Sequence, residues 1–237
     1  MGRLDGKNAL VGAGGWLQYK EHKVPTDERL SAYANEFDFV EVNSLFYQLI
    51  HPQTVERWRK SVPTDFEFSI KCYQALTHKI GLRPVEDAFR VFAMMQKYCE
   101  ILNSKILVMQ MPPSLKLDEK FVLDARAFFK SIDFGDLRFV FEFRVTTTRM
   151  PGNLLNMLRD FNMVHTVDLT FEDPRVETNL LYSRVFGMPE KHNALDDKDL
   201  QVLKEKVEKS KAPDVRVVGH SLKMIEDTRR IKETLYT

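Results

Sequence analysis

The chain has 237 residues, of which 43% are hydrophobic and 29% are charged, and its 35 basic side chains nearly balance 34 acidic ones. A formal net charge of +1 gives no overall attraction to nucleic acid or to an anionic membrane, so we expect neither as a partner. No apolar run approaches the length of a membrane-spanning helix, and the first ten residues lack the apolar segment of a secretion signal. Cys72 and Cys99 form no C-x-x-C motif, so we expect free thiols in a cytoplasmic protein.

Short strand-like segments recur along the chain, with helical patterns between most of them. The eight predicted strands are Ala9–Ala13, Phe37–Asn43, Glu67–Cys72, Lys105–Met111, Arg138–Arg144, Val164–Leu169, Leu180–Phe186 and Val215–His220. Strands that alternate with helices form a parallel sheet, and eight such units of roughly 30 residues predict a closed (β/α)8 or TIM barrel. An open, doubly wound sheet is the alternative. Its glycine fingerprint is incomplete, because Leu17 stands where the third glycine after Gly12 and Gly14 should be.

One predicted unit departs from the pattern. Only Thr170–Asn179 separates the sixth strand from the seventh, and Pro174 interrupts it, so we predict an irregular loop in place of a helix. No linker or shift in composition divides the chain, which predicts a single domain spanning residues 1–237.

The alternation of residues along the strands predicts a polar site, as in the strand Arg138–Arg144. Its sequence, RFVFEFR, puts three phenylalanines on one face and Val140, Glu142 and Arg144 on the other. Unpaired buried charges cost several kcal/mol, so an acid and a base at a strand end indicate a polar site. If the strand face that carries Glu142 points into the barrel, the inward faces of the other strands also carry polar residues near their carboxyl ends. Active sites of this fold lie at that end.

Strand ends and the loops that follow them supply the candidate site residues. The predicted catalytic residues are Glu41, Lys71, Glu142, Asp168 and His220. The predicted substrate-binding residues are Trp16, Asn43, Tyr47, His78, Gln110, Arg144, Tyr182 and Arg184. Lys71 could act as a nucleophile or base, or could hold an anion. The carboxylates and His220 also offer the donors that a divalent metal accepts, although no metal motif is present, so a metal cofactor stays open. In the structural alternative, the acids and bases only neutralise one another.

A series of motifs resembles the DUF72, or YecE-like, family. These motifs are Gly14-Gly15-Trp16, Glu41-Val-Asn43-Ser44-Leu-Phe46-Tyr47, Trp58, Pro63-x-x-Phe66-x-Phe68, Lys71, Thr77-His78, Gln110-Met-Pro112-Pro113, Glu142-Phe-Arg144 and Tyr182-x-Arg184-x-x-Gly187. The resemblance implies a TIM barrel related to sugar-isomerase-like proteins, and implies the fold more than the reaction. Three positions depart from the family pattern: Val145-Thr146-Thr147-Thr148 in place of a His after E-x-R, Phe186 in place of a His, and Gly219-His220-Ser221 in place of an Asn-Asn pair.

These observations predict an enzyme of isomerase or hydrolase type that acts on a small polar, sugar-like or anionic molecule. The alternatives are a non-catalytic ligand-binding barrel and, less favoured, a metal-dependent nucleic-acid-processing enzyme. The residues leave the oligomeric state open.

Overall fold

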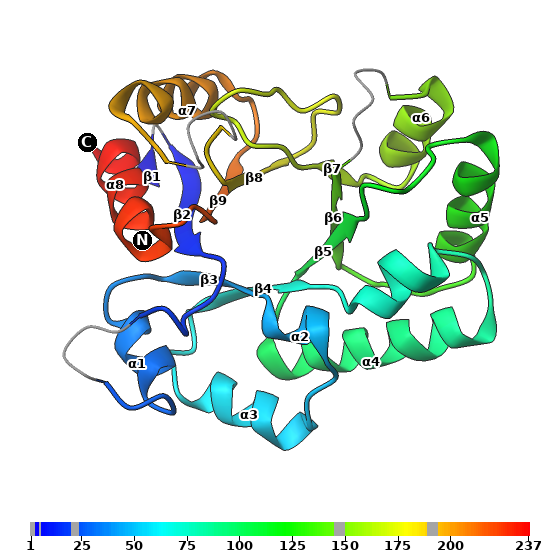
Figure 1. Ribbon diagram of the computed structural model, residues 1–237, viewed down its shortest axis with the longest axis horizontal. Coiled ribbons are helices and arrows are strands. Elements are labelled where there is room, and N and C mark those ends of the chain that lie inside the picture. The colour runs from blue at the N-terminus through cyan, green and yellow to red at the C-terminus, as the bar shows by residue number, and fades with distance from the viewer. Residues whose placement is uncertain (1–2, 5, 20–23, 145–149, 189–193) are drawn as a thin grey trace.

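The computed structural model describes residues 3–4, 6–19, 24–144, 150–188 and 194–237. It confirms the predicted α/β barrel, in which parallel strands follow one another in the order β7-β6-β5-β4-β3-β2-β9-β8 (Figure 1). These strands are β2 (Lys7–Ala13), β3 (Phe39–Val42), β4 (Glu67–Lys71), β5 (Ile106–Met111), β6 (Arg138–Phe143), β7 (Val164–His165), β8 (Leu180–Val185) and β9 (Asp214–Gly219). A short strand that was not predicted, β1 (Arg3–Leu4), pairs antiparallel with β2.

The seam between β7 and β8 closes the barrel and has the fewest contacts between neighbouring strands. A single parallel bridge joins Val167 to Ser183, where Arg184 N donates to Val167 O at 3.3 Å. By contrast, β5 and β6 stay in register over six residue pairs. The bridge makes the open-sheet alternative wrong.

Helices cover the outside of the sheet. They are α1 (Arg29–Ala34), α2 (Ser44–Tyr47), α3 (Pro52–Lys60), α4 (Glu86–Leu102), α5 (Glu119–Lys130), α6 (Gly152–Asp160), α7 (Asp197–Lys209) and α8 (Met224–Tyr236), with one π-helical segment, η2 (Ala75–Ile80). The segment Thr170–Asn179 contains no helix, as predicted. Among the described residues, no helix combines the length and apolarity needed to cross a membrane.

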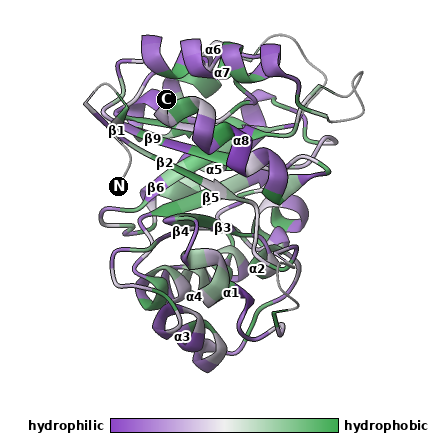
Figure 2. Cartoon of the chain, turned by 90° about the vertical axis from the view of Figure 1, so that its left-hand side faces the viewer, coloured by the Kyte–Doolittle hydropathy of each residue, from purple (hydrophilic) through white to green (hydrophobic). Residues whose placement is uncertain are grey.

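Alternate residues of each strand pack into two different layers. Phe139 and Phe141 of β6 point outward against Phe129 of α5, with ring centroids 4.9 and 5.9 Å apart. Val140 points inward and joins an apolar layer that fills the barrel, together with Val108, Val218 and their neighbours. The hydropathy view shows the same order, with apolar strands inside and polar outer faces on the helices (Figure 2). This arrangement agrees with the predicted orientation of β6, in which Glu142 lies on the inner face of the strand.

The amino end of the barrel also carries charges, but these pair with one another. Arg216 donates to both carboxylate oxygens of Glu67, at 2.6 and 2.7 Å, and Arg138 lies 3.0 Å from Asp214. Each of these pairs joins two strands that are not neighbours in the sheet.

Candidate active site

Arg184 in β8 is the hub of the polar side chains at the carboxyl end of the barrel. Its buried guanidinium donates from Nε to Glu41 Oε2 at 3.1 Å and from Nη2 to Glu41 Oε1 at 2.9 Å. Its Nη1 donates to Glu142 Oε2. A guanidinium suits this position because its fixed fork can hold one carboxylate with two bonds and still reach a second. One arginine therefore joins β3 to β6 across the interior.

The carboxylate of Glu41 contacts other side chains inside the barrel. Tyr182 Oη donates to its Oε2 at 2.8 Å and lies 2.8 Å from Ser69 Oγ, while His220 Nε2 lies 3.1 Å from its Oε1. Burial alone would raise the pKa of Glu41, but the charge of Arg184 and the contact with His220 outweigh it and hold that pKa well below its usual range. Glu41 is thus an ionised carboxylate that is buried from solvent and positions Arg184.

Glu142 is the carboxylate that faces open space. Its Oε1 accepts from Arg144 Nε at 2.7 Å, and its side chain keeps 12% exposure. It borders a cavity of about 420 Å³ that is also lined by Arg144, Thr166, Arg184 and Phe186. Burial opposes its ionisation, yet Arg184 and Arg144 lower the pKa of Glu142. At neutral pH this wall of the cavity therefore carries a carboxylate between two guanidinium groups.

Lys71 ends β4, across the barrel mouth from Arg184. Its Nζ lies 3.8 Å from the centroid of the Phe46 ring, and it has no hydrogen-bond or ion-pair partner within the described part of the chain. Burial and the positive charge of Arg184 lower the pKa of Lys71 to about 8. Lys71 is therefore a buried cation that no carboxylate contacts directly.

The wall beside Lys71 is aromatic. The ring of Phe46 meets His78 edge-on at 5.1 Å and Tyr47 at 4.9 Å. His78 Nδ1 lies 2.8 Å from Thr77 Oγ1 on the π-helical segment η2, a type of distortion that is frequent at functional sites. Burial and the charge of Lys71 lower the pKa of His78, which favours its neutral form.

His220 follows β9 and is held by close packing. Its ring stacks on Phe186, with centroids 4.8 Å apart, and a Cβ on Gly14 would lie only 2.3 Å from its Nδ1. Burial and the charge of Arg184 lower the pKa of His220, so the imidazole is neutral beside Glu41. Glycine at position 14 is what leaves room for this ring.

Both carboxylate oxygens of Asp168 accept hydrogen bonds from the neighbouring loops. Thr170 donates to Oδ1 from its N and Oγ1, at 3.0 and 2.7 Å, and Phe186 N and Gly187 N donate to Oδ2 at 2.7 and 3.0 Å. Burial raises the pKa of Asp168 despite these bonds. Its geometry is that of a brace between the loops after β7 and β8.

The barrel mouth also gathers polar atoms that have no partner. Within the described residues, the buried side-chain atoms without a hydrogen bond are Asn43 Oδ1, Ser44 Oγ, Gln110 Oε1 and Thr166 Oγ1. All four lie at or just after the carboxyl ends of β3, β5 and β7. A buried polar atom left unpaired costs about 1–3 kcal/mol, so this grouping marks the place where water or a ligand completes the structure.

Trp16, a predicted binding residue, lies apart from this network and packs edge-on against Trp58 at 5.1 Å in the outer hydrophobic cluster. Tyr47 contacts Phe46 in the aromatic wall but is mostly exposed. The predictions missed Thr166, although its spacing of two from Asp168 gives it the same strand parity. The family departure at residues 145–148 lies outside the described residues.

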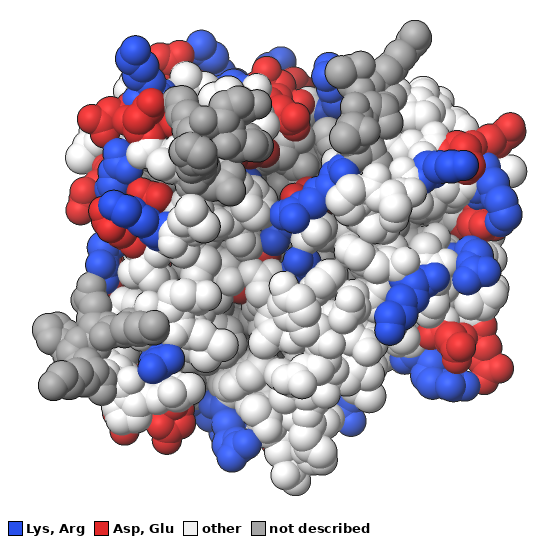
Figure 3. All heavy atoms as spheres, in the orientation of Figure 1, with Lys and Arg blue, Asp and Glu red and all other residues white. Residues whose placement is uncertain are grey.

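The charge view shows the face formed by the loops that follow the strands (Figure 3). Basic side chains gather near its middle, over a hollow in which acidic atoms are visible. Around Arg184, three cations (Lys71, Arg144 and Arg184) lie near the carboxylates Glu41 and Glu142, while the carboxylate of Asp168 turns its oxygens to the loops. Of the three cations, Lys71 is the one that contacts no carboxylate among the described residues.

The donors suggested for a metal do not form a ligand set. In the part of the chain that the structure describes, no group of three or more His, Cys, Asp or Glu side chains is placed to hold an ion. The oxygens of Glu41 and Asp168 are already occupied by hydrogen bonds. These residues do not fit a resident metal.

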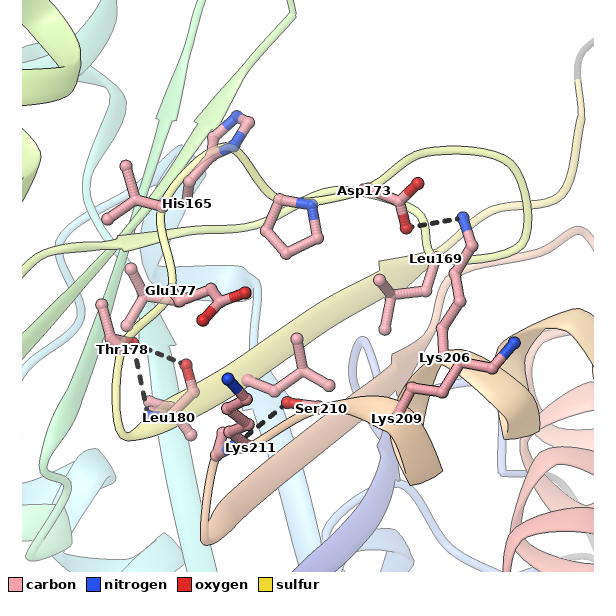
Figure 4. A pocket seen from close by; sticks show the side chains of 15 residues that line it. His165, Leu169, Asp173, Glu177, Thr178, Leu180, Lys206, Lys209, Ser210 and Lys211 are labelled. Atoms are coloured by element: carbon pink, nitrogen blue, oxygen red, sulfur yellow. Dashed lines mark hydrogen bonds and ion pairs between the residues drawn. The ribbon is translucent and has the colours of Figure 1, made fainter.

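A second cavity, of about 340 Å³, lies outside the barrel where the helix after β7 is missing (Figure 4). Leu169, Pro174 and Leu180 form much of its wall, and Lys206 at its edge pairs with Asp173 at 3.0 Å. None of the unpartnered buried polar atoms lines it. The unpartnered buried polar atoms therefore lie at the barrel mouth and not at this cavity.

The fold and this mouth define an α/β-barrel protein with a charged pocket at the carboxyl ends of its strands. The chain belongs to the family described as "Protein of unknown function DUF72", whose model matches residues 10–235. This confirms the resemblance seen in the motifs.

Two curated relatives are similar over part of the chain. UPF0759 protein YunF of Bacillus subtilis is 28% identical over 170 residues, which are 66% of this chain and 59% of YunF. UPF0759 protein YecE of Escherichia coli is 36% identical over 63 residues, which are 27% of this chain and 23% of YecE. Each match thus spans less than two thirds of the relative's length.

Solved structures show the same fold over nearly the whole chain. A DUF72 family protein from Thermotoga maritima matches with a TM-score of 0.77 and 19% identity, covering 97% of this chain and 100% of its own. A DUF72 family protein from Enterococcus faecalis matches with a TM-score of 0.72 and 18% identity, covering 98% of each chain.

Proposed function

We propose that this protein is an enzyme of isomerase type that moves a proton on a small, anionic, sugar-like molecule held at the barrel mouth. The observation that carries this proposal is the position of Glu142, an ionised carboxylate that borders the cavity between Arg144 and Arg184. A carboxylate in that state is a general base, and the guanidinium groups stabilise negative charge that develops on the substrate.

Proton transfer fits this site better than glycosidic hydrolysis does. Hydrolysis of that kind uses two carboxyl groups on either side of the reacting bond. Glu41 is fully buried and bonded to Arg184 and Tyr182, so Glu142 would act without a second free carboxylate. The unpaired oxygens of Asn43 and Gln110 would accept hydrogen bonds from substrate hydroxyl groups, and Arg144, which lines the cavity, would match its anionic group.

The test is solvent deuterium incorporation into a panel of three- to six-carbon sugar phosphates, followed by proton NMR in D2O. We expect the wild type to bind one member and exchange a carbon-bound proton. Glu142→Gln should keep binding but lose exchange, while Glu100→Gln, on an exposed face of α4, should behave as the wild type. Binding without exchange in the wild type would instead support a ligand-binding barrel, and no binding across the panel would contradict the proposal.

A further inference from the structure

Lys71 lies on the strand between two strands that end in unpartnered amide oxygens. The strands β3, β4 and β5 are neighbours, and their carboxyl ends carry Asn43, Lys71 and Gln110. Asn43 Oδ1 and Gln110 Oε1 are buried without a partner, and Asn43 is fixed in orientation because its Nδ2 donates to Gly14 O at 2.6 Å. The geometry therefore places an amine with an acceptor on the strand to either side.

These acceptors define the chemistry of what would lie over the amine. An amide oxygen accepts hydrogen bonds and cannot donate them, so the groups bound to Asn43 Oδ1 and Gln110 Oε1 in these orientations are donors. Hydroxyl groups on neighbouring carbon atoms meet this need. The carbon that faces Lys71 would then lie in a chain of hydroxylated carbons, as the carbonyl carbon of a sugar does.

The surroundings of Lys71 suit a nucleophile better than a permanent ion pair. Arg144 and Arg184 each contact a carboxylate, whereas the Lys71 nitrogen contacts the face of the Phe46 ring at 3.8 Å. With 7% exposure the side chain is largely shielded from water. Its pKa of about 8 leaves about a tenth of the amine neutral at pH 7, which is the form that attacks carbon.

We propose that Lys71 captures the carbonyl group of a hydroxylated ketone or aldehyde as a covalent iminium ion. The ammonium first loses a proton, and the Nζ lone pair then attacks the carbonyl carbon while the C=O π electrons move to oxygen. Protonation of that oxygen and its departure as water leave a C=N bond whose nitrogen carries one hydrogen and the positive charge. In sum, an ammonium and a carbonyl become an iminium and one water, and no oxidant, reductant or metal takes part.

The covalent step explains how Glu142 can work as a base, and in this respect it rests on the proposed function. The guanidinium groups that lower the pKa of Glu142 also make it a weak base. An iminium nitrogen withdraws electrons and makes the hydrogen on the adjacent carbon far more acidic than a neutral carbonyl does. Lys71 would therefore supply the activation that a weak carboxylate base requires.

The test is reductive trapping with dihydroxyacetone phosphate, a hydroxylated ketone that carries an anionic group. The wild type is incubated at pH 7–9 with this probe and sodium cyanoborohydride, and the adduct is mapped by peptide mass spectrometry. We expect one dominant adduct on Lys71, with the mass of the probe less water plus two hydrogens. The initial trapping rate should rise with pH as the amine loses its proton. Lys71→Arg should lose the adduct, whereas Lys97→Arg, on the exposed side of α4, should keep it.

A second probe separates this inference from the proposed function. Glycerol 3-phosphate has the hydroxyl and phosphate groups but no carbonyl, so it can bind without forming an iminium. Modification spread over surface lysines, or no adduct on Lys71 in the wild type, overturns the covalent inference. If glycerol 3-phosphate still binds at the mouth in that case, the anion-binding site of the proposed function stands; if it also fails to bind, both fall. Because the map is made on the wild type, the result does not depend on the folding of a variant.

Discussion

Phe186 and His220 stack face to face, with ring centroids 4.8 Å apart and an angle of 16° between their planes. The motif resemblance implies a departure from the family pattern at both positions. Arg144 and Arg184 also lie over the Phe186 ring, at 4.8 and 5.3 Å from its centroid. Phe186 and His220 therefore form one local unit that supports the guanidinium groups of the site.

A double-mutant cycle tests whether this pair acts as a unit. Phe186→Leu and His220→Asn each remove one ring, and we expect an interaction energy of about 0.5–1.5 kcal/mol between them. The measurement is the free energy of unfolding in urea for the wild type, both single variants and the double variant. Additive effects, within about 0.3 kcal/mol, would contradict a coupled replacement.

Arg184→Met should destabilise the protein strongly, because it leaves Glu41 buried beside no guanidinium. We expect a loss of about 3–5 kcal/mol in the free energy of unfolding. The matched control is Arg90→Met, which removes an exposed ion pair with Glu86 and should cost no more than about 0.5 kcal/mol. A small effect at both positions would show that the buried network contributes little to folding.

Gly14→Ala should be destabilising through a direct clash. The added methyl would lie 2.1 Å from His220 Cε1 and 2.9 Å from Asn43 Nδ2, so these side chains must shift. We expect a loss of about 1–3 kcal/mol in thermal or urea unfolding. Gly152→Ala is the control, because nothing lies within 4 Å of a Cβ there and α6 begins at that residue. Equal stability of the two variants would show that position 14 tolerates a side chain.

His165 should make stability depend on pH between about 6.5 and 4. Burial and the charge of Arg175 lower the pKa of His165 from 6.5 to about 4, and its Nδ1 accepts from Arg175 N at 3.0 Å. As the pH falls through this window, the unfolded chain takes up the proton before the folded one, so the free energy of unfolding decreases. We expect a contribution of about 3 kcal/mol that is complete above pH 6.5 and lost by pH 4. His165→Asn keeps an acceptor without titrating, so its stability should fall less over the same range; identical pH profiles would contradict this account.

Much of the fold could be predicted from the sequence because its signals are local. Strand parity alone places Glu142 and Val140 inward and Phe139 outward, and the short span of Thr170–Asn179 excludes a helix. The two-residue strand β1 and the short helix α2 were missed, because segments of that length carry almost no periodicity.

The roles within the site depend on contacts that no local pattern records. Arg184 reaches Glu41 across 143 positions of sequence, and this contact seals the carboxylate that parity marks as a candidate base. Asp168 has the same parity, but its oxygens turn to the backbone of the two loops that it joins. Trp16 follows a strand, as other predicted binding residues do, yet its ring packs against Trp58.

The most direct test of the account is whether a small anionic sugar derivative reaches the unpaired amides at the barrel mouth. The measurement is the NMR shift of the side-chain amides of Asn43 and Gln110 during titration with the same sugar phosphates, with the exposed Gln201 of α7 as the internal control. We expect at least one compound to shift Asn43 and Gln110 saturably and to leave Gln201 unchanged. If no compound shifts the signals of Asn43 and Gln110, or if all three signals drift together, the barrel mouth is not the ligand site that its unpaired oxygens and the unpaired Lys71 indicate.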